Sequence, residues 1–151
     1  MTIANLKVVS GRTENALSAM QRITSLSRRI GSRMSRGAKV LIVDDSPVNL
    51  TVVAGMLKGM GFTDLTTAHN GSEALVKLLT EPYDLVLTDV RMPEMDGHTL
   101  VQEIRKLPAY EKMLVYAITA DDATKDNFKE LGFTDVVLKP VTMEKLQDIL
   151  G

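Results

Sequence analysis

The sequence predicts an α/β fold of three layers, in which a parallel sheet of five strands lies between helices on both faces. From residue 38 onward, short apolar runs alternate with longer segments whose apolar residues recur at helical spacing. Alternation of short strands with helices of roughly 8–14 residues is typical of βαβ units and therefore of a parallel sheet. The chain has 151 residues, 44% apolar and 25% charged, which suits one globular domain.

Each predicted element has a local signal. The first strand is an apolar run that ends at Asp44-Asp45. Pro47 suits the first turn of the helix that follows, and Gly61 ends that helix. Asp96 and Thr142 are predicted to cap the third helix and the last one. Strands are expected at 39–43, 65–68, 84–88, 113–119 and 136–138, and helices at 48–60, 72–79, 97–107, 123–131 and 143–150.

Residues 1–37 differ from the rest of the chain in charge. They carry seven cations and one acid, a balance of +6, whereas residues 38–151 carry 11 cations and 18 acids, a balance of −7. We therefore expect a basic N-terminal extension or linker at 1–37 and a domain at 38–151. Gly31 and Gly37 mark a flexible joint, and the spacing of apolar residues predicts a helix over 13–30. This helix would dock on a partner, on a second copy or on the acidic domain; a poorly ordered leader and the end of a truncated protein are the alternatives.

Composition excludes several kinds of site. The chain has no cysteine, which rules out disulfides, thiolate metal sites and a cysteine nucleophile. Its two histidines, His69 and His98, are too few for a multi-histidine zinc or haem site. The sequence has no apolar run near the ~20 residues of a membrane span and no secretory signal, so we expect a cytoplasmic protein.

Polar residues stand at the ends of four of the five predicted strands. They are Asp44 and Asp45 at the first strand, Asp89 at the third, Thr119 at the fourth and Lys139 at the fifth. In a parallel sheet the carboxyl ends of the strands meet at one edge, where ligands bind. A single Asp after a strand is usually a cap or turn residue, and it is the joint placement that predicts a site.

The residue types indicate the chemistry of this site. Three carboxylates brought together repel by about 4 kcal/mol per close pair at an effective dielectric near 20. Such a cluster requires a cation or raised pKa values. Oxygen ligands without His or Cys suit Mg²⁺ or Mn²⁺, and Lys139 and Thr119 add the charge and the hydroxyl that hold a phosphoryl group. Asp89, alone on the central strand, is the predicted nucleophile that forms an acyl phosphate.

Four motifs resemble the response-regulator receiver domain. They are VLIVDDSP at 40–47, LTDVRMPEMDG at 87–97, ITA at 118–120 and LKP at 138–140. The resemblance covers about residues 38–151 and implies a flavodoxin-like sheet of order 2-1-3-4-5. It also implies that Asp89 accepts a phosphoryl group from the phosphohistidine of a histidine kinase or of a histidine phosphotransfer domain.

The resemblance also implies metal ligands. Asp45, Asp89 and the main-chain carbonyl of Arg91 would bind Mg²⁺ directly, whereas Asp44 would act mainly through a bound water. Lys139 would pair with the phosphoryl oxygens.

Thr119 is the switch residue that the resemblance implies. It would hydrogen-bond to a phosphoryl oxygen and move inward, repacking the face of the fourth helix, fifth strand and fifth helix where a downstream protein binds. Family members often carry Tyr or Phe three residues before the lysine; here Val136 predicts a switch of small amplitude or one read through the backbone. Arg91 and Asp121 occupy positions that tune dephosphorylation in the family, and their opposite charges predict a pair across the mouth of the site and a long-lived acyl phosphate.

The predicted function is a phosphoacceptor in a two-component system or phosphorelay, with no enzymatic activity beyond its own phosphoryl acceptance and hydrolysis. The chain would be a free-standing regulator or the receiver part of a hybrid histidine kinase. Residues 46–49 resemble the same segment of hybrid-kinase receivers. No DNA-binding module follows the last helix, so no direct DNA binding is expected. The alternative is a pseudo-receiver that acts only as a protein-interaction module. A phosphatase with an Asp-x-Asp motif and a flavin or nucleotide binder with a glycine-rich loop match the residues less well.

Overall fold

The centre of the molecule is a parallel sheet of five strands. The computed structural model describes residues 7–9, 12–14, 29–30 and 33–151. The strand order is β6-β5-β7-β8-β9, and each neighbouring pair is parallel. Counted along the chain within this sheet, the order is 2-1-3-4-5, so the predicted topology is confirmed. The strands are β5 (Lys39–Val43), β6 (Asp64–Ala68), β7 (Leu85–Asp89), β8 (Leu114–Thr119) and β9 (Asp135–Leu138).

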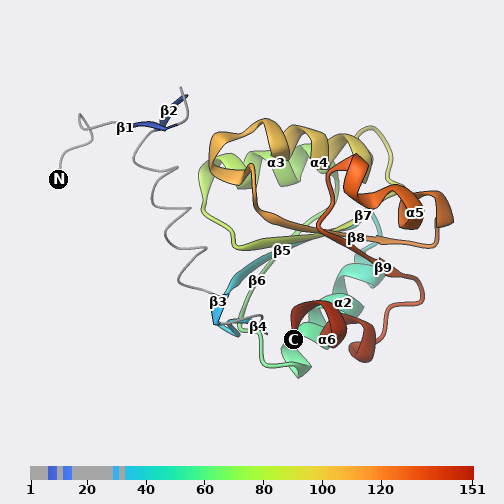
Figure 1. Cartoon of the computed structure of the whole chain (residues 1–151). Helices are drawn as coiled ribbons and strands as arrows, with labels where there is room; N and C mark the ends of the chain where they lie inside the picture. The colour runs from blue at the N-terminus through green and yellow to red at the C-terminus, as the bar shows by residue number, and fades with distance from the viewer. Residues whose placement is uncertain (1–6, 10–11, 15–28, 31–32) are drawn as a thin grey trace.

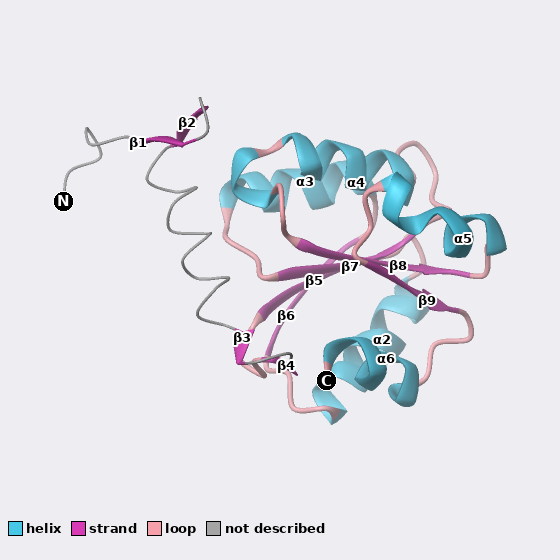
Figure 2. Cartoon of the chain, in the orientation of Figure 1, coloured by secondary structure: helices cyan, strands magenta, loops and turns pink. Residues whose placement is uncertain are grey.

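Helices cover both faces of the sheet and complete the predicted three layers. Figures 1 and 2 show α3, α4 and α5 on one face, and α2 and α6 on the other. These helices are α2 (Pro47–Gly59), α3 (Gly71–Thr80), α4 (Gly97–Lys106), α5 (Asp122–Leu131) and α6 (Met143–Leu150). Within the described residues, no helix combines the length and the apolar character that a membrane crossing requires.

The sheet is buried on both sides because its side chains alternate between two cores. Leu41 and Val43 of β5 belong to the cluster that includes residues of α3 and α4, whereas Val40 and Ile42 belong to the cluster with residues of α2 and α6. All five residues of β7 are buried, as expected for the central strand of a parallel sheet. Each fully buried Leu or Ile stabilises the fold by about 1.5–3 kcal/mol.

Side-chain caps determine where the helices begin. The predicted caps Asp96 and Thr142 are confirmed: each accepts a hydrogen bond from the third backbone N–H after it, at 2.8 and 3.1 Å. Ser46 and Asp121 cap α2 and α5. The predicted stop at Gly61 is also present, with a φ of +99° that only glycine adopts easily. These caps hold the loops that follow the strands.

Element boundaries differ from the predicted ones by one residue at several ends. The third strand is one example, since β7 extends through Asp89. Periodicity locates the buried face of an element better than its last residue. A short 3₁₀-helix, η1 (Pro108–Tyr110), lies between α4 and β8 and was not predicted.

The helix predicted over 13–30 is wrong at both of its ends. The structure has two antiparallel pairs of short strands there: β1 (Lys7–Val9) with β2 (Arg12–Glu14), and β3 (Arg29–Ile30) with β4 (Arg33–Met34). A glycine-containing pair separates the two strands of each hairpin in the sequence, which is a turn signal that the helical spacing had outweighed. Residues 15–28 lie outside the described residues.

Residues 34–37, predicted as part of a flexible joint, contact the domain. Met34 is 5% exposed and belongs to the core that includes residues of α2 and α6. The guanidinium of Arg36 lies 4.7 Å from the centre of the Phe62 ring and donates a hydrogen bond to the carbonyl oxygen of Gly151 at 2.7 Å. The boundary between an extension at 1–37 and a domain at 38–151 stays a prediction.

Candidate functional site

The predicted site residues stand at the carboxyl edge of the sheet. Asp44 and Asp45 follow β5, Asp89 is the last residue of β7, Thr119 is the last residue of β8, and Lys139 follows β9. Parallel pairing of β5 with β7, β7 with β8, and β8 with β9 brings these ends side by side. The edge strand β6 ends at Ala68, and neither Ala68 nor His69 lines the pocket described below.

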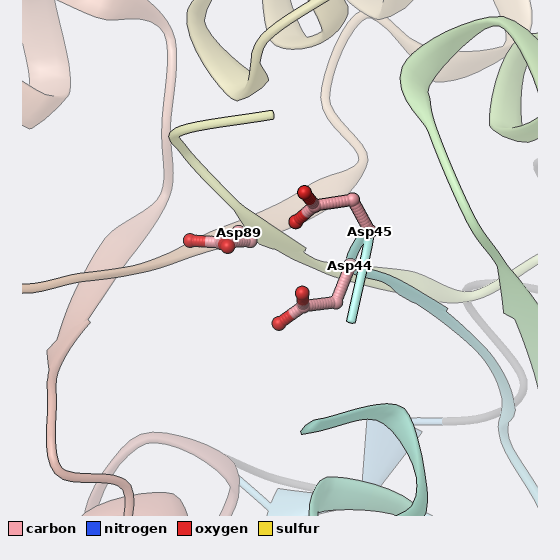
Figure 3. A group of neighbouring side chains, drawn as sticks. All are labelled: Asp44, Asp45 and Asp89. Atoms are coloured by element: carbon pink, nitrogen blue, oxygen red, sulfur yellow. The ribbon is translucent and has the colours of Figure 1, made fainter. Parts of the chain in front are cut away.

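The three carboxylates converge as predicted. One oxygen from each of Asp44, Asp45 and Asp89 lies within 4.8 Å of the other two. Figure 3 shows these side chains extending from the ends of two neighbouring strands. Asp44 and Asp89 are each 6% exposed, whereas Asp45 is exposed to solvent. The cluster is therefore open on one side and buried on the other.

The electrostatics of Asp44 reflect this crowding. Burial raises the pKa of its carboxyl, and the nearby charge of Asp89 raises it further. A hydrogen bond from the backbone N–H of Ser46, at 2.9 Å, opposes the shift in pKa. The Nζ atom of Lys139 lies 3.2 Å from Oδ1 of Asp89, so one ammonium group faces three carboxylates.

Local backbone contacts hold Asp89 in place. The N–H of Val90 donates a hydrogen bond to Oδ1 of Asp89 at 2.9 Å, and the hydroxyl of Thr88 donates one to the Asp89 carbonyl at 2.9 Å. The N–H of Gly97 donates to the Val90 carbonyl at 2.7 Å. A Cβ at Gly97 would lie 2.5 Å from the Asp89 carbonyl oxygen, so only glycine lets α4 start this close to the strand end.

A pocket of about 250 Å³ opens beside Asp89. It is lined by Asp89, Arg91, Thr119, Ala120, Asp121 and Lys139. The Thr119 hydroxyl oxygen accepts a hydrogen bond from the Asp121 backbone N–H at 3.0 Å, which leaves its own proton able to donate to a ligand. Carboxylate, hydroxyl and ammonium groups around a space of this kind suit a phosphoryl group.

The predicted pair across the mouth of the pocket is present. Nη2 of Arg91 lies 3.7 Å from Oδ2 of Asp121. The Arg91 side chain is 83% exposed, so this ion pair is weak, and its effect depends on how firmly the carboxylate is held.

Two contributors to the site were not predicted. Ser46 donates to Asp44 and caps α2, and the Ser-Pro pair at a helix start was the available sequence signal. Gly97 packs against the Asp89 backbone; its sequence signals were its position after the predicted cap Asp96 and at the end of the motif at 87–97.

The fold and the site define a class, that of three-layer α/β modules with an acidic pocket at the carboxyl ends of the strands of a parallel sheet. Within that class, residues 40–151 match the family model of the response regulator receiver domain. The chain belongs to this family, whose members are the receiver domains of two-component signal transduction.

Curated relatives agree with this assignment. The probable chemotaxis protein CheY of Rhizobium etli is 34% identical over 111 residues, which are 72% of this chain and 86% of that protein. The sensor histidine kinase RcsC of Salmonella typhi is 36% identical over 112 residues, which are 74% of this chain but 12% of the kinase. The chain thus spans most of the length of the chemotaxis protein and a small part of the length of the sensor kinase.

Solved structures of similar proteins have sequence identities close to those of the curated relatives. The chemotaxis protein CheY4 of Vibrio cholerae has a TM-score of 0.70 and 33% identity, over 76% of this chain and 96% of that one. The receiver domain of the sensor histidine kinase PA1611 of Pseudomonas aeruginosa has a TM-score of 0.68 and 33% identity, over 76% of this chain and 94% of that one. That structure has a magnesium ion coordinated in its active-site cleft.

Proposed function

We propose that this receiver accepts a phosphoryl group on Asp89 from a phosphohistidine, and that the reaction requires Mg²⁺. The observation that carries the proposal is the convergence of three carboxylate oxygens within 4.8 Å, faced by the single ammonium of Lys139. Such a cluster fits a hard divalent cation, because all its donors are oxygens and its negative charge exceeds the positive charge beside it. Asp45, Asp89 and the Arg91 main-chain carbonyl would hold the ion, with Asp44 acting through water.

The transfer needs a nucleophile and a place for negative charge. A carboxylate oxygen of Asp89 attacks phosphorus, the P–N bond to the histidine breaks, and an acyl phosphate forms on Asp89. An ion held by these carboxylates would neutralise negative charge on the phosphoryl oxygens and on the carboxylates. Lys139, already 3.2 Å from Asp89, pairs with one phosphoryl oxygen. The Thr119 hydroxyl donates to another, and Ala120 is small enough to leave the approach open.

A phosphodonor has an apolar surface to bind beside the site. Val48 and Val52 of α2, close in sequence to Asp45, are 70% and 47% exposed. Two valines one helical turn apart form a stripe that a helix of a histidine kinase or phosphotransfer domain would cover.

For the binding of a downstream partner, we propose the surface formed by α5, β9 and α6. There Val136, half-buried, occupies the position expected to report on Thr119.

Intact-mass measurement tests the proposal. With Mg²⁺ and acetyl phosphate, the protein should gain one phosphoryl group, and Asp89→Asn should abolish that gain. Asp64→Asn, which changes an exposed acid at the other end of the sheet, is the matched control and should be phosphorylated like the wild type. If the wild type gains no mass with Mg²⁺, the phosphoacceptor role is wrong and the chain acts as a phosphorylation-independent interaction module.

A further inference from the structure

A chain of polar side chains leads from the mouth of the pocket to a histidine on α4. Thr124 is the fully buried residue of α5, and its hydroxyl donates a hydrogen bond to Oδ2 of Asp121 at 3.2 Å. On the other side, the same hydroxyl oxygen lies 2.9 Å from Nε2 of His98. Asp121 in turn lies 3.7 Å from Arg91. These hydrogen-bonded side chains therefore connect α4 and α5 to the pocket wall.

The direction of these hydrogen bonds follows from proton count. The Thr124 hydroxyl has a single proton, which it donates to the Asp121 carboxylate. Its oxygen then acts as the acceptor for His98, so Nε2 of the imidazole must carry a proton. The Phe133 ring, inclined at 61° to the imidazole of His98 with the ring centroids 6.1 Å apart, helps to hold the imidazole plane. His98 thus donates to Thr124, and Thr124 donates to Asp121.

These contacts leave Asp121 little freedom. Its Oδ1 accepts from the Ala123 backbone N–H at 2.9 Å, and its Oδ2 accepts from Thr124. The hydrogen bond from Ala123 has the largest effect on the pKa of this carboxyl and lowers it, and the hydrogen bond from Thr124 lowers it further. An exposed ion pair is usually weak because two side chains lose rotamer freedom to form it. Here the carboxylate is already held, so Arg91 alone must become ordered.

We propose that Thr124 and His98 are positioning residues that hold Asp121 so that its pair with Arg91 shields the phosphoryl group on Asp89 from water. This inference rests on the function proposed above. In the reaction that the pair slows, a water oxygen attacks phosphorus and the bond between phosphorus and the Asp89 carboxyl oxygen breaks. The carboxylate is regenerated, and inorganic phosphate leaves with both protons of the water.

The lifetime of the phosphorylated protein tests the role of Thr124. After removal of acetyl phosphate, Thr124→Val, which keeps the volume and deletes the hydroxyl, should lose its phosphoryl group about two- to fivefold faster than the wild type, the effect of losing an exposed ion pair. Thr124→Ser should restore the wild-type lifetime.

The role of His98 is tested in the same way. The phosphorylated form of His98→Gln, which keeps an N–H at similar reach, should decay more slowly than that of His98→Met. Thr80→Val, which removes a helical hydroxyl from α3, is the control and should leave the lifetime unchanged.

A double-mutant cycle separates positioning from a general effect on α5. In an Asp121→Ala background, Thr124→Val should cause no further acceleration, because the group it positions is gone. Equal acceleration in both backgrounds would show that Thr124 acts through the helix and would overturn the inference. Unchanged or slower decay in Thr124→Val alone would overturn it too, because Asp121 would then not shield the phosphoryl group.

A measurement without phosphorylation checks the geometry. Nitrogen NMR of the His98 imidazole should show the Nε2–H tautomer in the wild type and a loss of that preference in Thr124→Val. A neutral Nδ1–H tautomer in the wild type would overturn the inference. Failure of the wild type to take up a phosphoryl group would overturn both proposals, whereas normal uptake with unchanged lifetimes in the variants would overturn this one alone.

Discussion

The two ends of the strands in the central sheet differ in how their charged groups are paired. We call the side where the strands begin the amino edge, and the side where they end the carboxyl edge. At the amino edge, charged groups have matched partners: the Asp84 carboxylate accepts from the Lys39 backbone N–H at 2.7 Å, and the Lys39 ammonium pairs with Glu81. At the carboxyl edge, three carboxylates crowd within 4.8 Å around one ammonium. The same strands therefore begin in an arrangement that favours stability and end in one that opposes it.

Arg105 is the centre of the amino edge. Its guanidinium donates hydrogen bonds to the carbonyl oxygens of Gly132 at 2.9 Å, Tyr110 at 3.1 Å and Met113 at 2.6 Å. Burial lowers the pKa of Arg105, but its hydrogen bonds to backbone carbonyl oxygens compensate for the lost hydration. This one side chain joins α4 to the segments that precede β8 and β9.

The difference in charge pairing indicates which end of the sheet carries the functional site. Stability requires that buried charges find partners, and the amino edge meets that requirement within the protein. The carboxyl edge leaves negative charge uncompensated, which is useful only if a cation or a phosphoryl transfer uses it. Three experiments test this contrast, beginning with the largest expected effect.

Removing the Arg105 guanidinium should damage the amino edge. We expect Arg105→Met to lower the free energy of unfolding by about 2–4 kcal/mol, because the carbonyl oxygens that accept hydrogen bonds from the guanidinium lose their donor. Urea denaturation measures the change. Lys106→Met, at the neighbouring exposed position, is the control and should change stability by less than about 0.5 kcal/mol. A loss of less than about 1 kcal/mol for Arg105→Met would mean that water replaces the guanidinium and that the edge is not stabilised as described.

Adding Mg²⁺ should stabilise the carboxyl edge. At tenfold excess over its Kd, the ion should raise the free energy of unfolding by about 1.4 kcal/mol, because it binds the folded protein alone. Asp45→Asn should remove most of this gain, and Asp64→Asn should keep it. Thermal denaturation with and without Mg²⁺ is the measurement. An equal gain in all three proteins would point to a general salt effect and would contradict a metal site at the acidic cluster.

Neutralising Asp44 should relieve the carboxyl edge in the absence of metal. Its carboxyl has a pKa raised mainly by burial, so the folded protein binds this proton more tightly than the unfolded chain. Stability should therefore fall as the pH rises from the ordinary carboxylate range through the raised pKa. Asp44→Asn should increase the free energy of unfolding by about 1 kcal/mol at pH 7.

The pH profile of this variant provides the check. The stabilisation by Asp44→Asn should shrink below the ordinary carboxyl pKa, where both the wild-type folded protein and its unfolded chain carry the proton. Denaturation from pH 3 to 8 in buffer with a chelator measures it. A variant that is less stable than the wild type at pH 7 would show that the hydrogen bond from Ser46 outweighs the crowding.

Much of the domain was predictable from local signals. Burial of strands on both faces gives continuous apolar runs, and β5 was predicted with its observed ends, Lys39 and Val43. The caps Asp96 and Thr142 were found because a cap acts on the helix that directly follows it. The convergence of Asp44, Asp45 and Asp89 followed from parallel topology, which brings the strand ends to one edge.

Other features depend on contacts that no local pattern contains. Arg105 serves carbonyl groups of segments up to 27 residues away, and its sequence context is that of an ordinary helix end. The contact of His98 with Thr124 joins two helices across 26 residues. The helix predicted over 13–30 failed at its ends because an apolar spacing that suits a helix does not exclude a hairpin.

The amino-acid sequence alone therefore determined the order of strands and helices, the edge at which the acids, the hydroxyl and the ammonium meet, and the family to which the motifs point. Those features depend on periodicity, capping and chain direction, which act over a few residues or follow from topology. Only the tertiary structure decided which charges have partners: it packed Arg105 among carbonyl groups and left Asp89 with Lys139 and two other acids. The physical reason is that the energy of a charge depends on all the groups within a few ångströms, and packing alone brings those groups together.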